Sequence, residues 1–291
     1  MRLVSFDGQR IGLLVDQQVI DVTSMIEGHQ EEWPPLNMVR MIAAFPRLRG
    51  KLAELNPAAV GVPMSSVRLT APLQWPNKVI AYPTNYHDHI AEMGGGGRSD
   101  RLGFFLKANS SLCGPDTPVV LPAVGGAEVH HEAELAVIVG RTGRHIAVAD
   151  VHEFIFGYSC LMDVTVRGGQ ERVMRKSFDT FCPMGPSLVT RDEVSDPDRL
   201  EICLSVNGEQ RQRASTRDMI LDVASLVSLA SSVATLYPGD VIATGTPAGV
   251  GPLRDGDTVS MAISEVGELT MHVVQGTGGG DALPWSQGGP V

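Results

Sequence analysis

The sequence has few of the features that mark specialised classes of protein. Only 5% of its 291 residues are aromatic, and no apolar run approaches the roughly 20 residues needed to cross a bilayer. The four cysteines are scattered and form no CxxC pair, so we expect neither a zinc site nor a disulfide framework. The first residues lack the charged and apolar regions of an export signal. We therefore expect a cytoplasmic protein.

Positive charge is also scarce. The chain has 33 acidic and 23 basic residues, which gives a formal net charge of −10. This excess argues against nucleic acid or an anionic membrane as the partner. A small anionic substrate would therefore need local positive charge, from a metal ion or from a few placed lysines and arginines.

The remaining composition is that of an ordinary globular protein, with 43% hydrophobic and 19% charged residues. Strands outnumber helices and do not alternate regularly with them, which predicts an α+β, predominantly β fold with mixed sheets. A Pro-rich connection divides a small N-terminal α+β domain, 1–70, from a larger domain, 71–275. The Gly-rich end of the sequence, 276–291, is expected to be a flexible tail.

The local patterns predict individual elements. A β-meander is expected over 1–23, followed by a helical stretch over 35–56 that is divided near Pro46 and Gly50. A further helix is expected from Ser215 or Asp218 to Leu236, on the basis of its apolar stripe. Other helices are expected at 86–93 and 148–153, and strands at 78–81, 104–107, 118–121, 134–139, 156–164, 199–206, 241–243, 258–263 and 268–274.

Two glutamates stand one residue apart in "HHEAELAVIVG". In a strand, Glu132 and Glu134 point to the same face, next to a run that is apolar on both faces. Like charges beside a dry core repel one another unless something positive lies between them. A third acid, Asp163, follows the apolar strand in "FIFGYSCLMD". Three carboxylates at strand ends suit a hard cation such as Mg²⁺, Mn²⁺ or Ca²⁺.

Other segments carry residues suited to chemistry. In "NYHDHIAE", His89 and Glu92 share a helix face, so the carboxylate can orient the imidazole as a general base. Lys107 and Lys176 follow in "FFLKANSSLCGP" and "RKSFDTFCPMGP", where a lysine that reaches solvent is the alternative. In the loop "TGTPAGVG", Thr244, Gly245 and Thr246 offer hydroxyls and backbone N–H groups to a carboxylate, and a purely structural turn is the alternative explanation of the glycines.

Taken together, the segments resemble the fumarylacetoacetate hydrolase family, as found in bacterial two-domain members. The matching segments run in the family's order over roughly residues 80–265: "NYHDHIAE", "FFLKANSSLCGP", "HHEAELAVIVG", "GYSCLMDVTVR", "KSFDTFCPMGP", "VNGEQRQ" and "LYPGDVIATGTPAGVG". The resemblance implies a mixed β-sandwich roll, a divalent metal (Mg²⁺ or Mn²⁺), a homodimer, and cleavage of carbon–carbon bonds in small keto acids.

The resemblance also implies roles for individual residues. The implied metal ligands are Glu132, Glu134 and Asp163. The implied catalytic residues are His89 and Glu92, carried on a lid, and Lys176, which would stabilise developing negative charge. The implied substrate-binding residues are Tyr86, Lys107, Arg167, Gln170 and Thr246.

The expected reaction follows from these roles. Hydroxide made by the His89–Glu92 pair would attack a 2,4-dioxo acid of the acylpyruvate type, and a metal-stabilised enolate would leave. An oxaloacetate-type decarboxylase or an isomerase/decarboxylase is the alternative, and a non-catalytic binding homologue is a remote one. The chain departs from the family at Met162, where an asparagine is usual, and at His131, where a tyrosine is usual.

Overall fold

The computed structural model describes residues 1–29, 31–95, 97–123 and 127–277. One residue of the glycine run at 94–97 and nearly all of the predicted tail, 278–291, lie outside this part. No helix within the described residues is long and apolar enough to cross a membrane.

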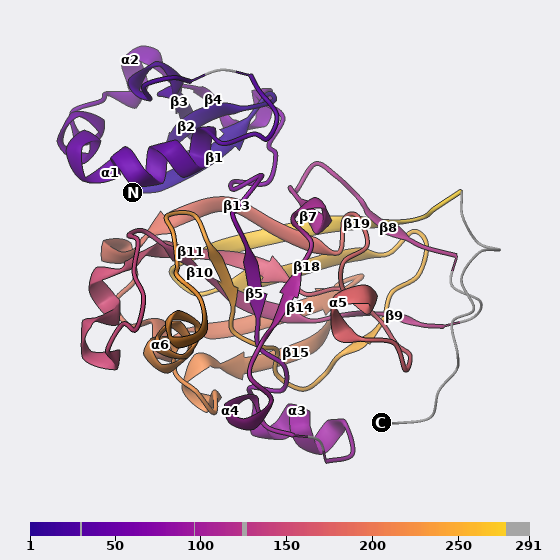
Figure 1. The fold of residues 1–291 in the computed structure, drawn as a ribbon. Helices are drawn as coiled ribbons and strands as arrows, with labels where there is room; N and C mark the ends of the chain where they lie inside the picture. The colour runs from indigo at the N-terminus through magenta and orange to yellow at the C-terminus, as the bar shows by residue number, and fades with distance from the viewer. Residues whose placement is uncertain (30, 96, 124–126, 278–291) are drawn as a thin grey trace.

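A large sheet and a smaller sheet form the body of the molecule (Figure 1). The large sheet has the order β4-β3-β2-β1-β13-β11-β10-β16-β5-β6, with β7 also paired to β13, and the smaller sheet has the order β15-β14-β18-β19-β8. Most neighbours are antiparallel, but β5 and β16, β7 and β13, and β8 and β19 are parallel. The predicted mixed β-sandwich fold is therefore confirmed.

The strands of the large sheet are β1 Arg2–Phe6, β2 Arg10–Val15, β3 Gln18–Asp21, β4 Val62–Pro63, β5 Val79–Ala81, β6 Phe105–Lys107, β7 Leu112–Cys113, β10 Ala133–Val139, β11 Ile155–Met162, β13 Cys182–Thr190 and β16 Val241–Ala243. Those of the smaller sheet are β8 Val119–Leu121, β14 Glu201–Val206, β15 Glu209–Ser215, β18 Thr258–Ile263 and β19 Gly267–Gln275. A short third sheet joins β9 Val129–His131, β12 Thr165–Val166 and β17 Gly251–Pro252.

The two longest α-helices contribute to the hydrophobic core, and the other helices of the described residues are short. The α-helices are α1 Asn37–Ala53, α2 Pro57–Val60, α3 His87–Glu92, α4 Ser99–Leu102, α5 Arg172–Arg175 and α6 Val223–Val233. The 3₁₀ helices are η1 Thr23–Met25, η2 Met64–Ser66, η3 Asn109–Ser111, η4 Val148–Glu153, η5 Arg191–Glu193, η6 Pro197–Arg199 and η7 Thr216–Asp218.

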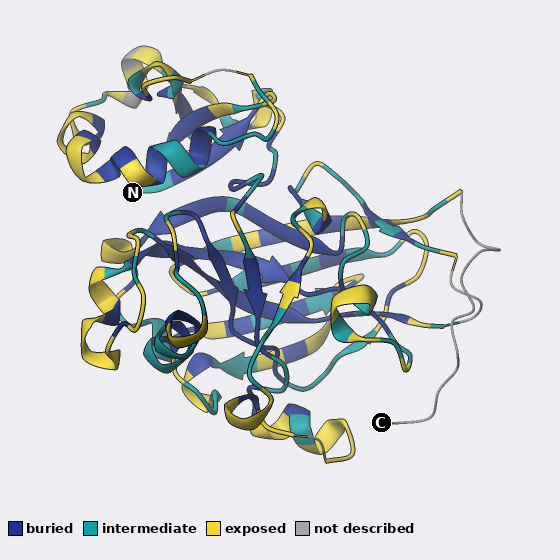
Figure 2. Ribbon diagram, viewed as in Figure 1, coloured by how far each residue is buried: buried dark blue, intermediate teal, exposed yellow. Residues whose placement is uncertain are grey.

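The core explains why β10 is apolar on both faces. Leu135 and Val137 pack into a hydrophobic cluster that also contains residues of β14, β18 and β19. Ala136 and Ile138 pack into a second cluster with α1 and the N-terminal strands. Figure 2 shows these central strands buried throughout. The strand is therefore held between two hydrophobic layers, which fixes the position of the acids at its start.

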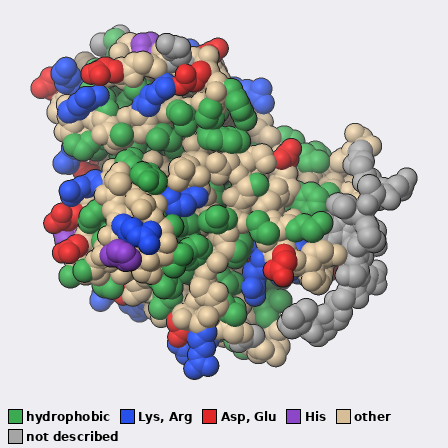
Figure 3. All heavy atoms as spheres, in the orientation of Figure 1, with side chains coloured by type: hydrophobic (Ala, Val, Ile, Leu, Met, Phe, Trp, Pro, Cys, Tyr) green, Lys and Arg blue, Asp and Glu red, His purple; other side chains and the backbone are tan. Residues whose placement is uncertain are grey.

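The N-terminal segment joins the body through both the sheet and the core. Strand β1 pairs with β13, and α1 contributes to the second cluster on the side that faces the body (Figure 1). The boundary near residue 70 stays a prediction. On the face shown in Figure 3, acidic and basic side chains are intermixed and lie mainly over the N-terminal segment and the edges.

Two predictions of local structure were wrong. Helix α1 continues through Pro46, because one face of the helix buries Met41, Ile42 and Phe45 while Pro46 stays exposed. Helix α6 starts later than predicted, at Val223, since the Asp222 side chain caps it by accepting the N–H of Ser225 at 2.8 Å. The expected helix at 148–153 is confirmed with the same bounds, as the 3₁₀ helix η4. Strands β13 and β15 were not predicted, and neither were the short strands β4, β7, β9, β12 and β17.

Candidate metal centre

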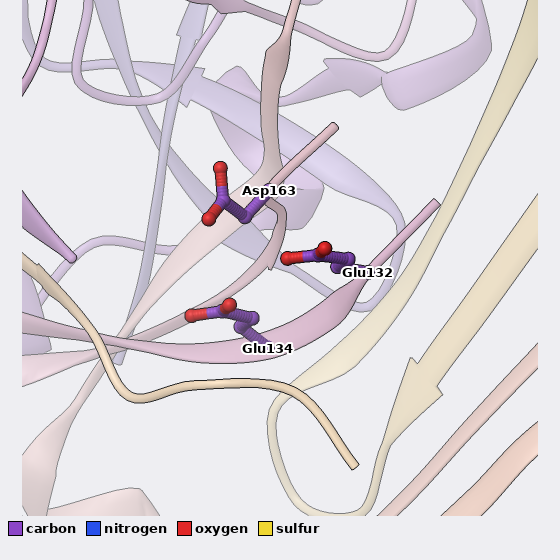
Figure 4. Close-up of side chains that lie close together, drawn as sticks. All are labelled: Glu132, Glu134 and Asp163. Carbon is purple, nitrogen blue, oxygen red and sulfur yellow. The ribbon is translucent and has the colours of Figure 1, made fainter. Parts of the chain in front are cut away.

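Strand pairing brings together the three acids that the sequence suggested as metal ligands. Glu132 lies between β9 and β10, Glu134 lies in β10, and Asp163 directly follows β11. The register sets Ala133 opposite Met162, and the Asp163 N–H donates to the Glu132 carbonyl at 2.9 Å. The three carboxylates are buried and project to the same side (Figure 4), with ligand oxygens all within 4.8 Å of one another.

Two buried ammonium groups and a guanidinium offset part of this negative charge. Lys176 Nζ donates to Glu132 Oε2 at 2.6 Å and to Asp163 Oδ2 at 2.7 Å. Lys107, at the end of β6, donates to the second carboxylate oxygen of Asp163. Arg167 Nη2 lies 3.3 Å from Glu132 Oε1. These cations surround Glu132 and Asp163 and leave the third acid apart.

The two glutamates have pKa values shifted in opposite directions. Burial raises the pKa of Glu132, but the charges of Lys176 and Arg167 outweigh burial and lower this pKa to about 2. Burial and the charge of Asp163 raise the pKa of Glu134 well above its ordinary value. The Glu134 carboxylate accepts the Gly245 N–H at 2.7 Å, a dipole rather than a full charge. The charge of Lys176 acts on Glu134 as well, but it does not offset burial and the neighbouring acids.

The donor set fits a hard divalent cation. All three ligand groups are carboxylates, and oxygen ligands are those that Mg²⁺, Mn²⁺ and Ca²⁺ prefer. Across 1–29, 31–95, 97–123 and 127–277, no other group of three or more His, Cys, Asp or Glu side chains is close enough to share an ion. A cation held here would supply further positive charge beside Glu134.

A histidine and a glutamate of α3 lie beside the acids. His89 is buried, and its Nδ1 lies 2.9 Å from Glu92 Oε2. When it carries a proton, the His89 imidazole is close enough to Glu132 to lower the pKa of that carboxyl group. Glu92 Oε1 accepts the Gly249 N–H at 2.9 Å. With Nδ1 held by Glu92, Nε2 is the ring nitrogen that can take up a proton.

Two of the residues suggested for substrate binding end in polar atoms that lack partners. Within the part of the chain that the structure describes, Tyr86 Oη and Gln170 Oε1 are buried and form no hydrogen bond, whereas Arg167 Nη2 has Glu132 as its ion-pair partner. Burial and the nearby charge of Glu134 raise the pKa of the Tyr86 phenol. Buried polar atoms normally have partners. A polar ligand is therefore the natural partner of these atoms.

The other two suggested substrate-binding residues already bond other side chains of the protein. Lys107 is buried against Asp163. Thr246 is buried as well, and its Oγ1 accepts the Gln212 Nε2–H at 2.8 Å. Their contact with a substrate stays a prediction.

Some contacts of the site were missed or misread from sequence. Gln212 belongs to the segment "VNGEQRQ", but nothing in that pattern gave it a role. The N–H groups of the loop after β16 were expected to bind a carboxylate, and in the structure two of them bind carboxylates of the protein itself, through Gly245 and Gly249. A polar residue in a strand whose side chain reaches the core has no distinct sequence signal, which is why Gln212 went unnoticed.

Comparison with known proteins agrees with this geometry. The family model of the fumarylacetoacetate (FAA) hydrolase C-terminal domain matches residues 78–274. The chain belongs to the fumarylacetoacetate hydrolase family. It is 39% identical over 285 residues to a maleylpyruvate hydrolase of Aquipseudomonas alcaligenes, covering 94% of this chain and 99% of the relative. It is 41% identical over 226 residues to a human mitochondrial oxaloacetate tautomerase, covering 73% of this chain and 71% of that one.

The fold of this family member also matches solved structures. A maleylpyruvate hydrolase from Sphingobium sp. SYK-6, in complex with manganese(II) and pyruvate, superposes with a TM-score of 0.87 at 48% identity. The match covers 95% of this chain and all of that one. A 2-hydroxyhepta-2,4-diene-1,7-dioate isomerase from Mycobacterium marinum gives a TM-score of 0.74 at 33% identity.

Proposed function

We propose that this protein is a metal-dependent hydrolase that cleaves a carbon–carbon bond in a small 2,4-dioxo acid of the acylpyruvate type. The observation that carries the proposal is the cluster of Glu132, Glu134 and Asp163 with the His89–Glu92 pair beside it. The relative of known structure that binds manganese(II) and pyruvate supports both the cofactor and the product class. Mg²⁺ or Mn²⁺ is the cation that these three carboxylates would hold.

A bound divalent cation would act as a Lewis acid toward the keto acid. The rest of the reaction falls to side chains of the chain. Glu92 keeps the proton of His89 on Nδ1, so Nε2 takes a proton from water as the water adds to the distal carbonyl. The carbon–carbon bond then breaks, and its electron pair passes to the pyruvate fragment as an enolate, which is protonated. The products are pyruvate and a carboxylic acid.

Lys176 is placed to stabilise the negative charge that develops in this reaction. Its ammonium group already bonds Glu132 and Asp163, and those two carboxylates raise the pKa of Lys176 despite the opposing effect of burial. It is therefore a fixed positive charge next to the reacting centre. Preorganised charge in a buried site is one of the larger contributions to catalysis.

A second carboxylate on the substrate fits the arginines near α5. The pKa of Arg175 is lowered by burial and by the neighbouring charges of Arg167 and Arg172, which together outweigh the opposing charges of Glu132 and Asp163. Arg175 Nε donates to the carbonyl of Gln170 at 2.7 Å, which ties this guanidinium to the loop beside the acids. Gathered guanidinium groups favour an additional anion. We therefore include dicarboxylic acylpyruvates among the preferred substrates.

Oxaloacetate tautomerisation is the second candidate, because a relative that is 41% identical carries that name. Moving a proton between carbon and oxygen needs an acid or base at the substrate but no attacking water. Hydrolysis would thus need His89 to activate water, whereas tautomerisation would not.

A substrate panel tests the proposal. We expect pyruvate release from acylpyruvates with Mg²⁺ or Mn²⁺, faster when the substrate carries a second carboxylate. His89→Gln should lower kcat for hydrolysis by about 10²- to 10⁴-fold, and His87→Gln, an exposed histidine on the same helix, should not. Turnover that survives thorough chelation would contradict the proposal. Oxaloacetate tautomerisation that persists in His89→Gln, with no pyruvate release from any acylpyruvate, would favour the second candidate.

The homodimer and the cytoplasmic location also stay predictions. Sedimentation velocity would measure the first. The four cysteines are all free, which agrees with a reducing compartment.

A further inference from the structure

One buried amide connects the acids of the site to the loop that follows β16. Gln212 lies in β15, in the smaller sheet, and is 0% exposed. We propose that Gln212 is a positioning residue that holds the metal-binding strand and the 244–249 loop in fixed relation to each other. The inference rests on the metal site of the proposed function.

The oxygen of the amide holds the strand that carries the acids. Gln212 Oε1 accepts the N–H of Ala133 at 3.0 Å, between Glu132 and Glu134 in the chain, and lies 3.3 Å from His131 Nδ1. Strand β16 pairs with β10 only from Ala136 onward. At Ala133, β16 no longer pairs with β10. The Gln212 side chain thus bonds the backbone there in place of the neighbouring strand.

The nitrogen of the amide holds the 244–249 loop. Gln212 Nε2 donates to Thr246 Oγ1 and to the carbonyl of Pro247, both at 2.8 Å. The N–H of Gly245, one residue before this contact, donates to Glu134. The N–H of Gly249, two residues after it, donates to Glu92. The loop therefore touches both a metal-binding acid and the partner of the catalytic histidine.

Through these four contacts Gln212 bonds both the strand that carries the metal-binding acids and the 244–249 loop. Loss of the amide would leave the buried N–H of Ala133 and the carbonyl of Pro247 without their partner, and such groups shift or admit water to regain one. A shift of Ala133 moves the two glutamates, and a shift of the loop moves the N–H groups that hold Glu134 and Glu92. Both metal binding and turnover should suffer in a protein that is still folded.

Gln212→Met tests the inference, because methionine has a similar length and no amide. Its control is Gln210→Met, an exposed glutamine on the same strand. The Mn²⁺ dissociation constant is measured without substrate by electron paramagnetic resonance, on protein shown to be folded by circular dichroism. We expect it to rise about 10-fold or more for Gln212→Met, the range found when groups that support metal ligands are removed, and to stay unchanged for Gln210→Met.

A second variant covers the case in which Gln212→Met does not fold. Gln212→Asn keeps the amide but is one methylene shorter, so it cannot reach Ala133 and Thr246 together, and it should also weaken Mn²⁺ binding and lower kcat more than it changes KM. A folded variant, of either kind, that binds Mn²⁺ as the unaltered protein does would overturn the inference. Because Mn²⁺ binding is read without substrate, this result stands even if the protein proves not to be a hydrolase.

Discussion

Two glutamates of the same type and burial, one residue apart, behave differently because of their neighbours. Glu132 bonds Lys176 and has a lowered pKa, whereas Glu134 bonds the Gly245 N–H, feels the charge of Lys176 without bonding it, and has a raised pKa. The difference identifies Glu134 as the acid whose ionised form is least favoured by the protein alone. Ionising Glu134 in this buried site costs free energy, and a bound cation would remove that cost.

The variant Glu134→Gln should separate metal binding from stability. Without metal it should unfold at the same temperature as the unaltered protein or higher, because a buried charge beside Asp163 is gone and the side chain can still accept the Gly245 N–H. With Mn²⁺ the unaltered protein gains stability from binding and the variant should gain little. Thermal unfolding with and without Mn²⁺ measures both, and metal-dependent turnover should be abolished.

Glu128→Gln is the matched control for this variant, since its side chain is 63% exposed. It should respond to Mn²⁺ as the unaltered protein does. An equal Mn²⁺-induced shift in Glu134→Gln would show that Glu134 is not a ligand.

At the scale of elements, an ion pair joins two parallel strands at their shared start. Lys78 precedes β5 and Asp240 precedes β16, and the side chains pair where these strands begin. Asp240 is fully buried, and it also accepts the N–H of Tyr237 at 2.7 Å. The pair sets the register of the strand that leads into the 244–249 loop.

Lys78→Met should destabilise the fold by about 3 kcal/mol or more at neutral pH, because it leaves a buried carboxylate without its counter-ion. Burial already raises the pKa of Asp240 against the effect of Lys78, and the loss of Lys78 would raise it further. A carboxyl group with a raised pKa in the folded state favours folding on protonation. The difference from the unaltered protein should therefore shrink as the pH falls.

Urea unfolding at a series of pH values measures this effect. Arg141→Met is the control, because the Arg141–Glu153 pair is 60% and 54% exposed and should contribute less than about 1 kcal/mol. A loss in Lys78→Met that does not change with pH would contradict the explanation.

At the scale of the whole molecule, the N-terminal segment and the body share one core. Phe45 of α1 packs edge-to-face on Phe156 of β11, with ring centroids 5.1 Å apart, and both belong to the second hydrophobic cluster. A division near residue 70 therefore crosses a continuous core and a continuous sheet. We expect the two parts to unfold together.

Phe45→Ala should lower the stability of the entire chain by about 3–5 kcal/mol, the usual cost of removing a buried phenylalanine. Calorimetry should show a single transition, before and after the substitution, that moves to lower temperature as a unit. Two transitions, of which only one moves, would show instead that residues 1–70 fold as an independent domain.

Much of this architecture was accessible from the sequence, for identifiable reasons. The run after Glu134 is apolar at every position, so a strand buried on both faces was the direct interpretation. Strand β15 has the polar sequence "EQRQRAS" because it lies at the edge of its sheet, and β13 is interrupted by Pro183 and Pro186, so neither gave a strand pattern. Gln212 could not be predicted as a core residue for the same reason, because it lies in this polar strand.

The bond between Glu92 and the Gly249 amide has a further use. If α3 leaves its place beside the acids as a lid would, this bond must break, and the Gly249 amide hydrogen becomes able to exchange with deuterium from solvent. Its exchange rate would therefore count the departures of the His89–Glu92 pair. The exchange rate of this one glycine amide would thus report how often the site is exposed to solvent, and it can be measured without a substrate.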